Sequence, residues 1–198
     1  MKKAKRCLLI FVRRPELGKV KTRLAAEVGD QKALDIYKRL LAHTQEVSQK
    51  VDCVRHLWYV DQIVQDDSWS TDHFRKYVQV EGDLGARMKA AFAEALKDHD
   101  QVIIVGSDCP QLSEEIVEQA FDSLSQSDTV IGPTFDGGYY LLGMKDLHAD
   151  LFDDMKWSVD DVCTVTKQRI NNLSLTVTEL PRLSDIDYKE DWDKYGLD

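Results

Sequence analysis

Residues 102–110 read Val102-Ile-Ile-Val-Gly-Ser-Asp108-Cys-Pro110, an apolar run that ends in a carboxylate and then a proline. A short run of Val and Ile is typical of a strand buried within a parallel sheet. The glycine and the proline end the strand, so Asp108 is predicted at its carboxyl edge. Ligands of open α/β sheets bind at that edge. The stretch therefore predicts an α/β fold with a charge at a ligand-binding edge. The alternative is that Asp108 only caps the following turn.

Strands and amphipathic helices alternate along the rest of the chain. Short apolar runs predict strands at residues 7–12, 54–60, 77–80, 129–131, 139–144 and 175–180. Helical spacing of apolar residues predicts helices at 21–28, 30–47, 84–96, 114–124 and 159–171. This alternation predicts a three-layer α/β/α fold with a mostly parallel mixed sheet. The Gly137-Gly138 turn adds antiparallel pairing late in the sheet. With no linker to divide them, residues 1–198 are predicted to form a single domain.

Composition narrows the class of protein. Apolar residues make up 43% of the chain, which is ordinary for a soluble domain, and the net charge is −9. The charge is uneven, because residues 1–23 hold nine Lys and Arg and one acidic residue. An acidic body argues against a nucleic-acid partner, and no apolar stretch is long enough for a membrane span. No targeting segment is visible, so a cytoplasmic location is expected. The four scattered cysteines favour neither disulfides nor structural zinc.

The strand at residues 7–12 runs directly into a cationic loop. This loop contains five basic residues, which are Arg13, Arg14, Lys19, Lys21 and Arg23. A helix is predicted to begin near Thr22, and the free N–H groups of a helix start favour an anion. Arginine adds a planar fork that suits phosphate oxygens. The spacing is neither that of a P-loop nor G-x-G-x-x-G. The loop is therefore a candidate phosphate site, and a solvated basic loop is the alternative.

Carboxylates near the carboxyl end are candidates for a second metal ligand beside Asp108. A divalent cation that bridges phosphate oxygens needs only one or two protein carboxylates. Asp185 and Asp187 stand two residues apart, so both side chains would face one side of an extended segment. Either could approach Asp108 if the last strand returns beside it. A solvated acidic tail is the alternative.

Three further segments are candidates for substrate contacts. The first is a glycine turn flanked by an acid and aromatics, Asp136-Gly137-Gly138-Tyr139-Tyr140. Its glycines allow close approach to a ligand, or else form a simple hairpin. Gly85 and Arg87, at a predicted helix start, could contact a base or a phosphate, although a surface helix start is equally consistent. Trp157 could line an acceptor pocket, or lie in the core or at its rim.

Several motifs occur in an order that resembles a known family, the bacterial DUF2064 group. They are Leu9-Ile-Phe-Val-Arg-Arg-Pro-Glu-Leu-Gly-Lys-Val-Lys-Thr-Arg-Leu24, Gly82-Asp-Leu-Gly-Ala-Arg-Met88, Gly106-Ser-Asp-Cys-Pro110, Gly132-Pro-Thr-Phe-Asp-Gly-Gly-Tyr-Tyr140, Trp157-Ser158 and Asp185-Ile-Asp187. The group is regarded as glycosyltransferase-like and similar to 2-phospholactate guanylyltransferase and molybdenum cofactor guanylyltransferase. The resemblance covers nearly the whole chain. It implies a GT-A-like nucleotide-diphospho-sugar transferase fold.

The resemblance also implies roles for individual residues. Lys19, Lys21 and Arg23 would contact phosphates, and Asp108 would hold Mg²⁺ or Mn²⁺. The terminal D-x-D would supply a second metal carboxylate, from either Asp185 or Asp187. Arg13 stands where the family pattern K-x-P has lysine, and the fingerprint G-x-G-x-R of nucleotidyltransferases is absent.

Together these observations predict a metal-dependent transferase that acts on a nucleotide-activated substrate and a small-molecule acceptor. Glycosyl transfer from a nucleotide-diphospho-sugar is favoured, with Asp108 and Asp136 as the catalytic carboxylates and Asp136 as the candidate base. One alternative is nucleotidyl transfer from an NTP with release of pyrophosphate. Another is a regulatory nucleotide-binding module without turnover. The base, the sugar, the acceptor and the oligomeric state stay open, a homodimer included.

Overall fold

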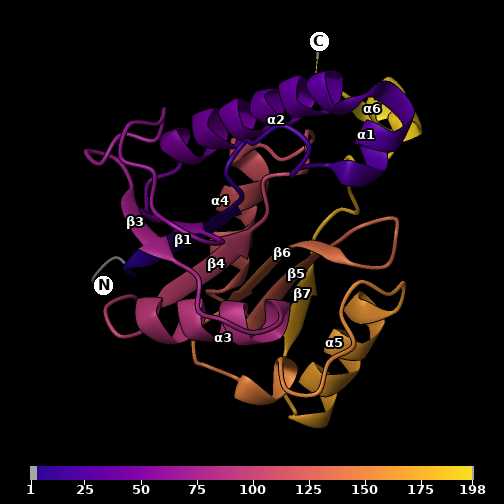
Figure 1. The fold of residues 1–198 in the computed structure, drawn as a ribbon. Coiled ribbons are helices and arrows are strands. Elements are labelled where there is room, and N and C mark those ends of the chain that lie inside the picture. Colours follow the sequence, from indigo (N-terminus) through magenta and orange to yellow (C-terminus); the bar gives the residue numbers. More distant parts are fainter. Residues whose placement is uncertain (1–3, 198) are drawn as a thin grey trace.

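The computed structural model describes residues 4–197, which form a seven-stranded sheet with helices on both faces (Figure 1). Residues 1–3 and 198 of the predicted domain lie outside this range. The strands are β1 (Arg6–Val12), β2 (Val54–Tyr59), β3 (Arg75–Val78), β4 (Gln101–Val105), β5 (Thr129–Pro133), β6 (Tyr139–Met144) and β7 (Val177–Glu179). The helices are α1 (Thr22–Val28), α2 (Asp30–Lys50), α3 (Leu84–Ala95), α4 (Glu114–Ser123), η1 (Ala149–Leu151), α5 (Val162–Asn172) and α6 (Lys189–Tyr195).

The sheet is mixed, with the strand order β3-β2-β1-β4-β6-β5-β7. Strands β3, β2, β1 and β4 are parallel, whereas β6 is antiparallel to both β4 and β5. The predicted fold class and the predicted antiparallel pairing at Gly137-Gly138 are therefore confirmed. The chain moves outward from β1 to β3 and then returns to place β4 on the other side of β1. The carboxyl ends of β1 and β4 thus lie side by side where the strand order reverses, a position that favours ligand binding.

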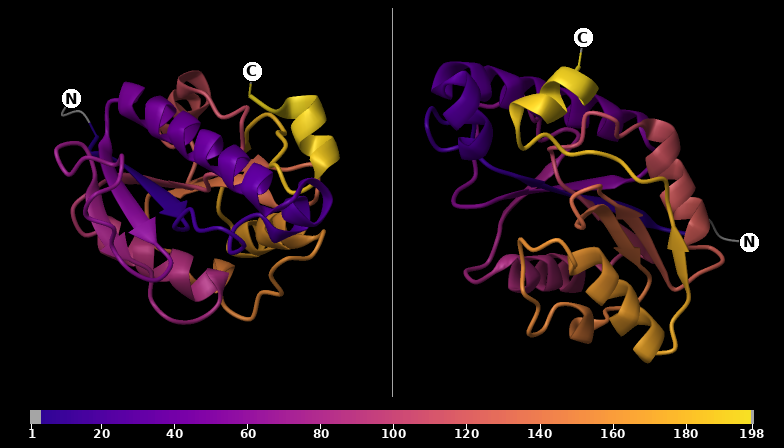
Figure 2. Two further views of the ribbon diagram at one scale, coloured as in Figure 1. Left: turned by 45° about the horizontal axis from the view of Figure 1, so that its top comes forward. Right: turned by 90° about the vertical axis from the view of Figure 1, so that its right-hand side faces the viewer.

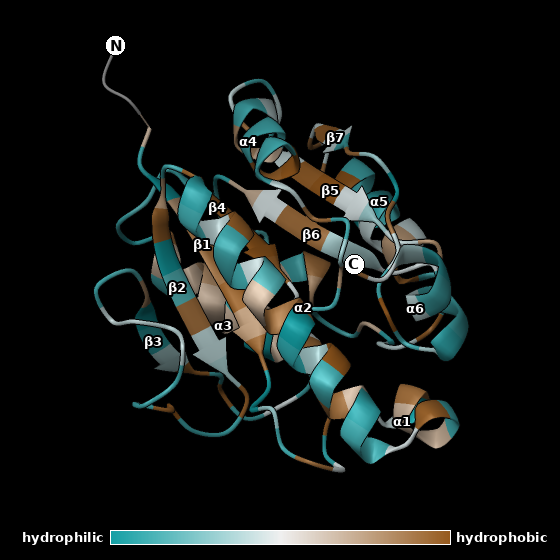
Figure 3. Cartoon of the chain, turned by 90° about the horizontal axis from the view of Figure 1, so that it is seen from above, coloured by the Kyte–Doolittle hydropathy of each residue, from teal (hydrophilic) through white to brown (hydrophobic). Residues whose placement is uncertain are grey.

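Each face of the sheet has its own apolar core. One core joins the strands to α2 and α4, with Tyr37, Phe121 and Leu124 among its buried members. The other joins the opposite face to α3, η1 and α5, with Phe92 and Ile170 among its buried members. Figure 3 shows the apolar residues gathered on the strands, while much of the outer surface of α2 is hydrophilic. Strand β4 is buried along its whole length, as its Val and Ile run predicts.

A third, smaller cluster attaches the end of the chain to the helical layer. Ile186 is fully buried among Leu24 of α1 and Ile36 and Leu40 of α2, with Trp192 of α6 packed at the margin. Figure 2 shows α6 beside α1 and the start of α2, at the same end of the molecule. This cluster fixes the segment 185–187 beside the loops that follow β1 and β4.

The predicted elements occur with small shifts at their ends. At α5 the helix begins at Val162 rather than Val159, with Asp161 at its N-cap, and Ser158 lies before the helix with a positive φ of 62°. Ser113 caps α4 as its sequence position indicates, and its hydroxyl oxygen accepts a hydrogen bond from Ile116 N. Between residues 4 and 197, no helix combines the length and apolar character that crossing a membrane requires.

A matched pair of leucines tests this packing. Leu124 and Leu173 both follow the last residue of a helix, but Leu124 is fully buried and Leu173 is 38% exposed. Leu124→Ala is expected to lower the free energy of unfolding by about 2–5 kcal/mol, and Leu173→Ala by less than about 1 kcal/mol. Urea denaturation measures both values. Equal effects would contradict the packing of α4 on the sheet.

Candidate active site

Three segments far apart in sequence meet through charged side chains at the carboxyl edge of the sheet. The ammonium group of Lys21 lies 2.9 Å from Asp108 Oδ2 and 3.3 Å from Asp187 Oδ1. The guanidinium of Arg23 lies 2.9 Å from the other oxygen of Asp187. The loop after β1, the loop after β4 and the segment before α6 thus form one network. The structure brings two of the predicted cations, Lys21 and Arg23, together with two of the predicted carboxylates, Asp108 and Asp187.

Local backbone geometry explains how these side chains converge. Lys21 adopts a left-handed conformation, with φ 48° and ψ 47°, at the position immediately before α1. This conformation is uncommon for a residue with a side chain, and such residues often mark functional sites. On the other side, Ile186 N donates a 3.0 Å hydrogen bond to the carbonyl oxygen of Asp108. Because Ile186 points into the core, its neighbours Asp185 and Asp187 point away from it.

Lys21 is the buried centre of the network. Its side chain is only 6% exposed, whereas those of Asp108 and Asp187 are 43% and 34% exposed. Burial alone would lower the pKa of Lys21, but the carboxylates of Asp108 and Asp187 outweigh burial and raise it. Lys21 therefore stays charged at neutral pH. A buried cation held by two carboxylates shows that this position favours positive charge.

A cleft of about 490 Å³ opens beside this network. Four basic side chains line it, against two acidic ones. The basic residues are Arg13, Lys21, Arg23 and Arg87, and the acidic residues are Asp108 and Asp187. The excess of positive charge suits a ligand that carries several negative charges.

A smaller pocket of about 160 Å³ lies on the other side of Asp108. Its lining includes Asp108, Asp136, Tyr139, Tyr140 and Asp185, and no basic residue of the range 4–197 lines it. Gly106 and Asp108 line both hollows, so the end of β4 separates a basic cleft from an acidic pocket.

The surroundings of Asp185 in the acidic pocket raise its pKa. Burial, together with the carboxylates of Asp136 and then Asp187, raises the pKa of Asp185 to about 6. Asp136 is held in place, because its Oδ1 accepts hydrogen bonds from the Thr134 hydroxyl and from Gly138 N, the latter at 3.1 Å.

The two terminal aspartates occupy different positions. Asp187 faces the basic cleft and shares Lys21 with Asp108, whereas Asp185 faces the acidic pocket. Within residues 4–197, the three carboxylates do not gather into one cluster of close potential ligands. At the basic cleft, Asp108 and Asp187 are the two carboxylates that could hold a divalent cation. Carboxylate oxygens are the ligands that Mg²⁺ and Mn²⁺ prefer, and the site already holds the ammonium cation of Lys21.

Four other candidates lie away from these contacts. Lys19 is 72% exposed and pairs with Glu16. Gly85 packs against the indole of Trp157, where an added Cβ would lie 2.7 Å from a ring carbon. Within the described part of the chain, Lys19, Gly85 and Trp157 line neither the basic cleft nor the acidic pocket. Gly137, with φ 92°, lies so close to Asp160 that a Cβ would overlap its carbonyl, so it shapes the turn. Their predicted ligand contacts stay predictions.

The basic cleft also contains residues that the sequence did not single out. Tyr37 donates from its hydroxyl to Arg13 O at 3.1 Å and accepts from Arg13 N at 2.9 Å. It therefore fixes the backbone at the start of the basic loop. Gln79 also lines the cleft, and its side-chain amide donates to Trp58 O. Ser158, which belongs to one of the motifs noted in the sequence, lines the cleft as well. In the sequence, Tyr37 is part of the apolar stripe of α2, and no local signal separates it from the core.

Comparison with protein families gives one assignment. A family model described as "Uncharacterized protein conserved in bacteria (DUF2064)" matches residues 26–159. The chain belongs to this family, which confirms the resemblance inferred from its motifs. A comparison with curated proteins found no match.

Solved structures show the same fold. A "putative nucleotide-diphospho-sugar transferase" from Desulfovibrio desulfuricans G20 is 35% identical, with a TM-score of 0.87 over 94% of this chain and 84% of that one. A cytidylyltransferase from Leptospira borgpetersenii is 16% identical, with a TM-score of 0.64 over 98% and 86%. Rv0371c from Mycobacterium tuberculosis H37Rv, in complex with manganese, is 13% identical, with a TM-score of 0.61 over 98% of each chain. The predicted nucleotide-diphospho-sugar transferase fold is thus confirmed.

The pKa of Asp185 generates a test by pH. The native pKa of about 6 exceeds the ordinary value of 3.8, so the native state binds more protons than the unfolded state between these values. The contribution of Asp185 to stability must then fall as pH rises from about 4 to about 6, by at most about 3 kcal/mol, and stay low above that. Asp185→Asn should remove this loss and be the more stable protein at pH 7. A difference between variant and wild type that stays constant from pH 3.5 to 7 would contradict this.

Proposed function

We propose that this protein is a metal-dependent transferase that acts on a nucleotide-activated substrate, with a nucleotide-diphospho-sugar as donor. The observation that carries the proposal is the position of Asp108 between a basic cleft and an acidic pocket. The donor would lie in the basic cleft, with its diphosphate toward Lys21 and Arg23. The acceptor would enter the acidic pocket, whose carboxylates and tyrosines can hydrogen-bond hydroxyl groups.

The chemistry would depend mainly on positioning and electrostatics. In glycosyl transfer, the bond between the sugar carbon and the diphosphate oxygen breaks, and a bond from that carbon to an acceptor oxygen forms. Negative charge builds up on the departing diphosphate, where Lys21 and Arg23 would stabilise it. Mg²⁺ or Mn²⁺, held by Asp108 and Asp187, would supply further positive charge to the same oxygens. The proton of the acceptor hydroxyl would pass to a carboxylate of the acidic pocket, with Asp136 as the candidate.

Similar proteins support this proposal. The Desulfovibrio desulfuricans protein, at 35% identity, is named as a transferase of nucleotide-diphospho-sugars, which is the class of donor proposed here. The Mycobacterium tuberculosis protein of the same fold was solved in complex with manganese, which supports a role for a divalent cation.

Nucleotidyl transfer is the second candidate, because a cytidylyltransferase shares the fold. It would use the same cleft and break a different bond, between the α- and β-phosphates of an NTP. The products distinguish the two reactions, since glycosyl transfer releases a nucleoside diphosphate and nucleotidyl transfer releases pyrophosphate.

Product analysis with a carboxylate variant tests the proposal. Wild-type protein is incubated with sugar nucleotides or NTPs and a panel of hydroxylated acceptors, with Mg²⁺ or Mn²⁺ and with a chelator. We expect nucleoside diphosphate release only with metal, and a loss of at least about 100-fold in Asp108→Asn. Asp122→Asn is the control, since Asp122 is exposed on α4 and pairs with Arg6. Release of pyrophosphate would favour nucleotidyl transfer, and nucleotide binding without any product would favour a regulatory module.

A second prediction follows from the place of Lys21 between the proposed metal ligands. Because Lys21 neutralises Asp108 and Asp187 in the free protein, a metal ion must compete with its ammonium group. Lys21→Met is therefore expected to bind Mn²⁺ more tightly than wild type in the absence of nucleotide, by about tenfold or more. The same variant should bind the nucleotide more weakly, because it lacks a phosphate contact.

Isothermal titration with Mn²⁺ alone and with a nucleoside diphosphate measures the two effects separately. Lys97→Met is the matched control, since Lys97 pairs only with Glu94 among the contacts of the described residues. Weaker Mn²⁺ binding in Lys21→Met would contradict a cation site at Asp108 and Asp187.

A further inference from the structure

A second group of potential metal ligands lies at the opposite, amino-terminal edge of the sheet. Cys7 of β1, His56 of β2 and His99 in the connection from α3 to β4 each present a ligand atom, and these atoms lie within 4.8 Å of one another. Leu9 is the partner of His56 in the β1–β2 register, so Cys7 and His56 lie on neighbouring strands. They share the face covered by α3. The cluster thus joins two strands to the segment that leads into a third.

His56 is the residue whose surroundings are hardest to explain by packing alone. The residue is 3% exposed, and neither of its ring nitrogens has a hydrogen-bond partner among residues 4–197. The ring packs against Tyr77 and lies edge-on to His99. These contacts explain the packing of the ring but give its nitrogens no hydrogen-bond partner. Buried polar atoms are nearly always paired, so an unpaired imidazole indicates a missing partner.

A backbone carbonyl fixes one ring nitrogen of His99. Its Nδ1 lies 2.8 Å from the carbonyl oxygen of Ala95, so in the neutral ring Nδ1 carries the proton and Nε2 the lone pair. A backbone carbonyl that fixes the tautomer in this way is a common partner of a metal-ligating histidine.

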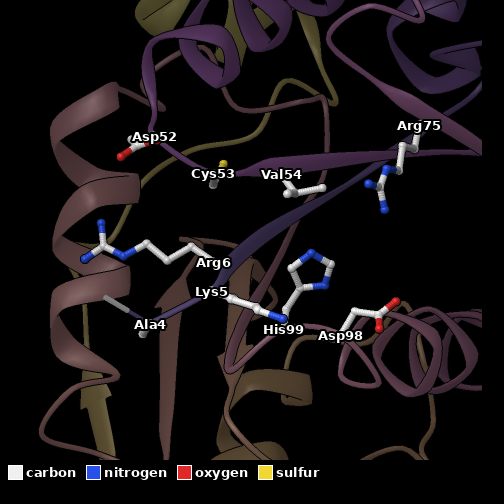
Figure 4. Close-up of a pocket in the computed structure, with 9 residues that line it drawn as sticks. All are labelled: Ala4, Lys5, Arg6, Asp52, Cys53, Val54, Arg75, Asp98 and His99. Atoms are coloured by element: carbon white, nitrogen blue, oxygen red, sulfur yellow. The ribbon is translucent and has the colours of Figure 1, made fainter. Parts of the chain in front are cut away.

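An open pocket reaches this cluster at His99, while Cys7 and His56 lie behind its wall. It has a volume of about 540 Å³, and Cys53, Arg75, Asp98 and His99 are among its lining residues. Figure 4 shows the imidazole of His99 between Arg6 on one side and Arg75 and Asp98 on the other. Arg6 is already neutralised, because it pairs with Glu118 and Asp122 at 2.7 Å each. On the same lining, the carboxylates of Asp52 and Asp98 balance the charges of Lys5 and Arg75. A cation or a water molecule could therefore reach His99.

We propose that Cys7, His56 and His99 form a Zn²⁺ site with an open fourth position toward this pocket. One thiolate and two imidazoles are a donor set that Zn²⁺ favours and that Mg²⁺ and Mn²⁺ do not. Around a tetrahedral Zn²⁺ the ligand atoms lie about 3.3–3.6 Å apart, so movements of roughly 1 Å would complete the site. The Cys7 thiol would lose its proton to solvent as the Zn–S bond forms, and a water molecule would take the fourth position.

This site would act on stability rather than on transfer. It would join β1, β2 and the start of β4 at the edge away from the cleft, and bound metal would raise the melting temperature. Its failure would leave the proposed transferase function unaffected, because the two sites lie at opposite edges and share no residue.

Cobalt(II) substitution tests the site directly. Untagged full-length protein, reduced and stripped of metal, is titrated with Co²⁺ and then with Zn²⁺. We expect one equivalent of Co²⁺ to give the absorption of a tetrahedral ion with a thiolate-to-cobalt charge-transfer band, and Zn²⁺ to abolish it. Cys7→Ser should remove the charge-transfer band. His56→Gln and His99→Gln should each weaken Zn²⁺ binding by at least about 100-fold, since even outer-shell changes cost 10–100-fold.

Matched controls separate this site from adventitious binding. Cys53→Ser, on the same pocket but outside the cluster, and His148→Gln should both retain the wild-type band and affinity. If Cys7→Ser fails to fold, the wild-type spectrum and His99→Gln still decide the matter. No charge-transfer band in the wild-type protein, or a band that depends on Cys53 and not on Cys7, would overturn the proposal.

Discussion

The ion pairs of Lys21 with Asp108 and Asp187 are the interaction on which the whole carboxyl edge depends. Lys21 follows β1, Asp108 follows β4 and Asp187 precedes α6, so one buried ammonium joins the beginning, the middle and the end of the chain. The carboxylates of Asp108 and Asp187 together offset the cost of burying Lys21. This arrangement holds a site for positive charge at the point where the strand order reverses.

The same network explains why two hollows of opposite character share one wall. The arginines and Lys21 line the basic cleft, whereas Asp136 and Asp185 line the acidic pocket beside the β5–β6 hairpin. Asp108 lies between them at the end of β4. A diphosphate and a hydroxylated acceptor could therefore meet at Asp108 while each remains in surroundings of suitable charge.

Sequence reasoning predicted the parts of this structure whose signals are local. The Val and Ile run before Asp108, the alternation of strands with amphipathic helices and the glycine turn at Gly137 fix the fold class, because each follows from backbone and burial preferences. Contacts between segments that are far apart in sequence could not be predicted in this way. The separation of Asp185 from Asp187 depends on the burial of Ile186 against α1 and α2. Likewise, Gly85 of α3 packs against Trp157, a residue far away in sequence, and this contact depends on where α3 lies in the fold.

The position of a bound metal ion tests most directly whether Asp108 and Asp187 form a cation site beside Lys21. Crystals grown with Mn²⁺ and a nucleoside diphosphate would be measured at a wavelength that gives an anomalous signal from manganese. We expect the manganese peak within about 2.0–2.4 Å of carboxylate oxygens of both Asp108 and Asp187. The ammonium group of Lys21 should have moved from Asp108 to the diphosphate. A peak elsewhere, or Lys21 still paired with both aspartates beside a bound nucleotide, would contradict this expectation.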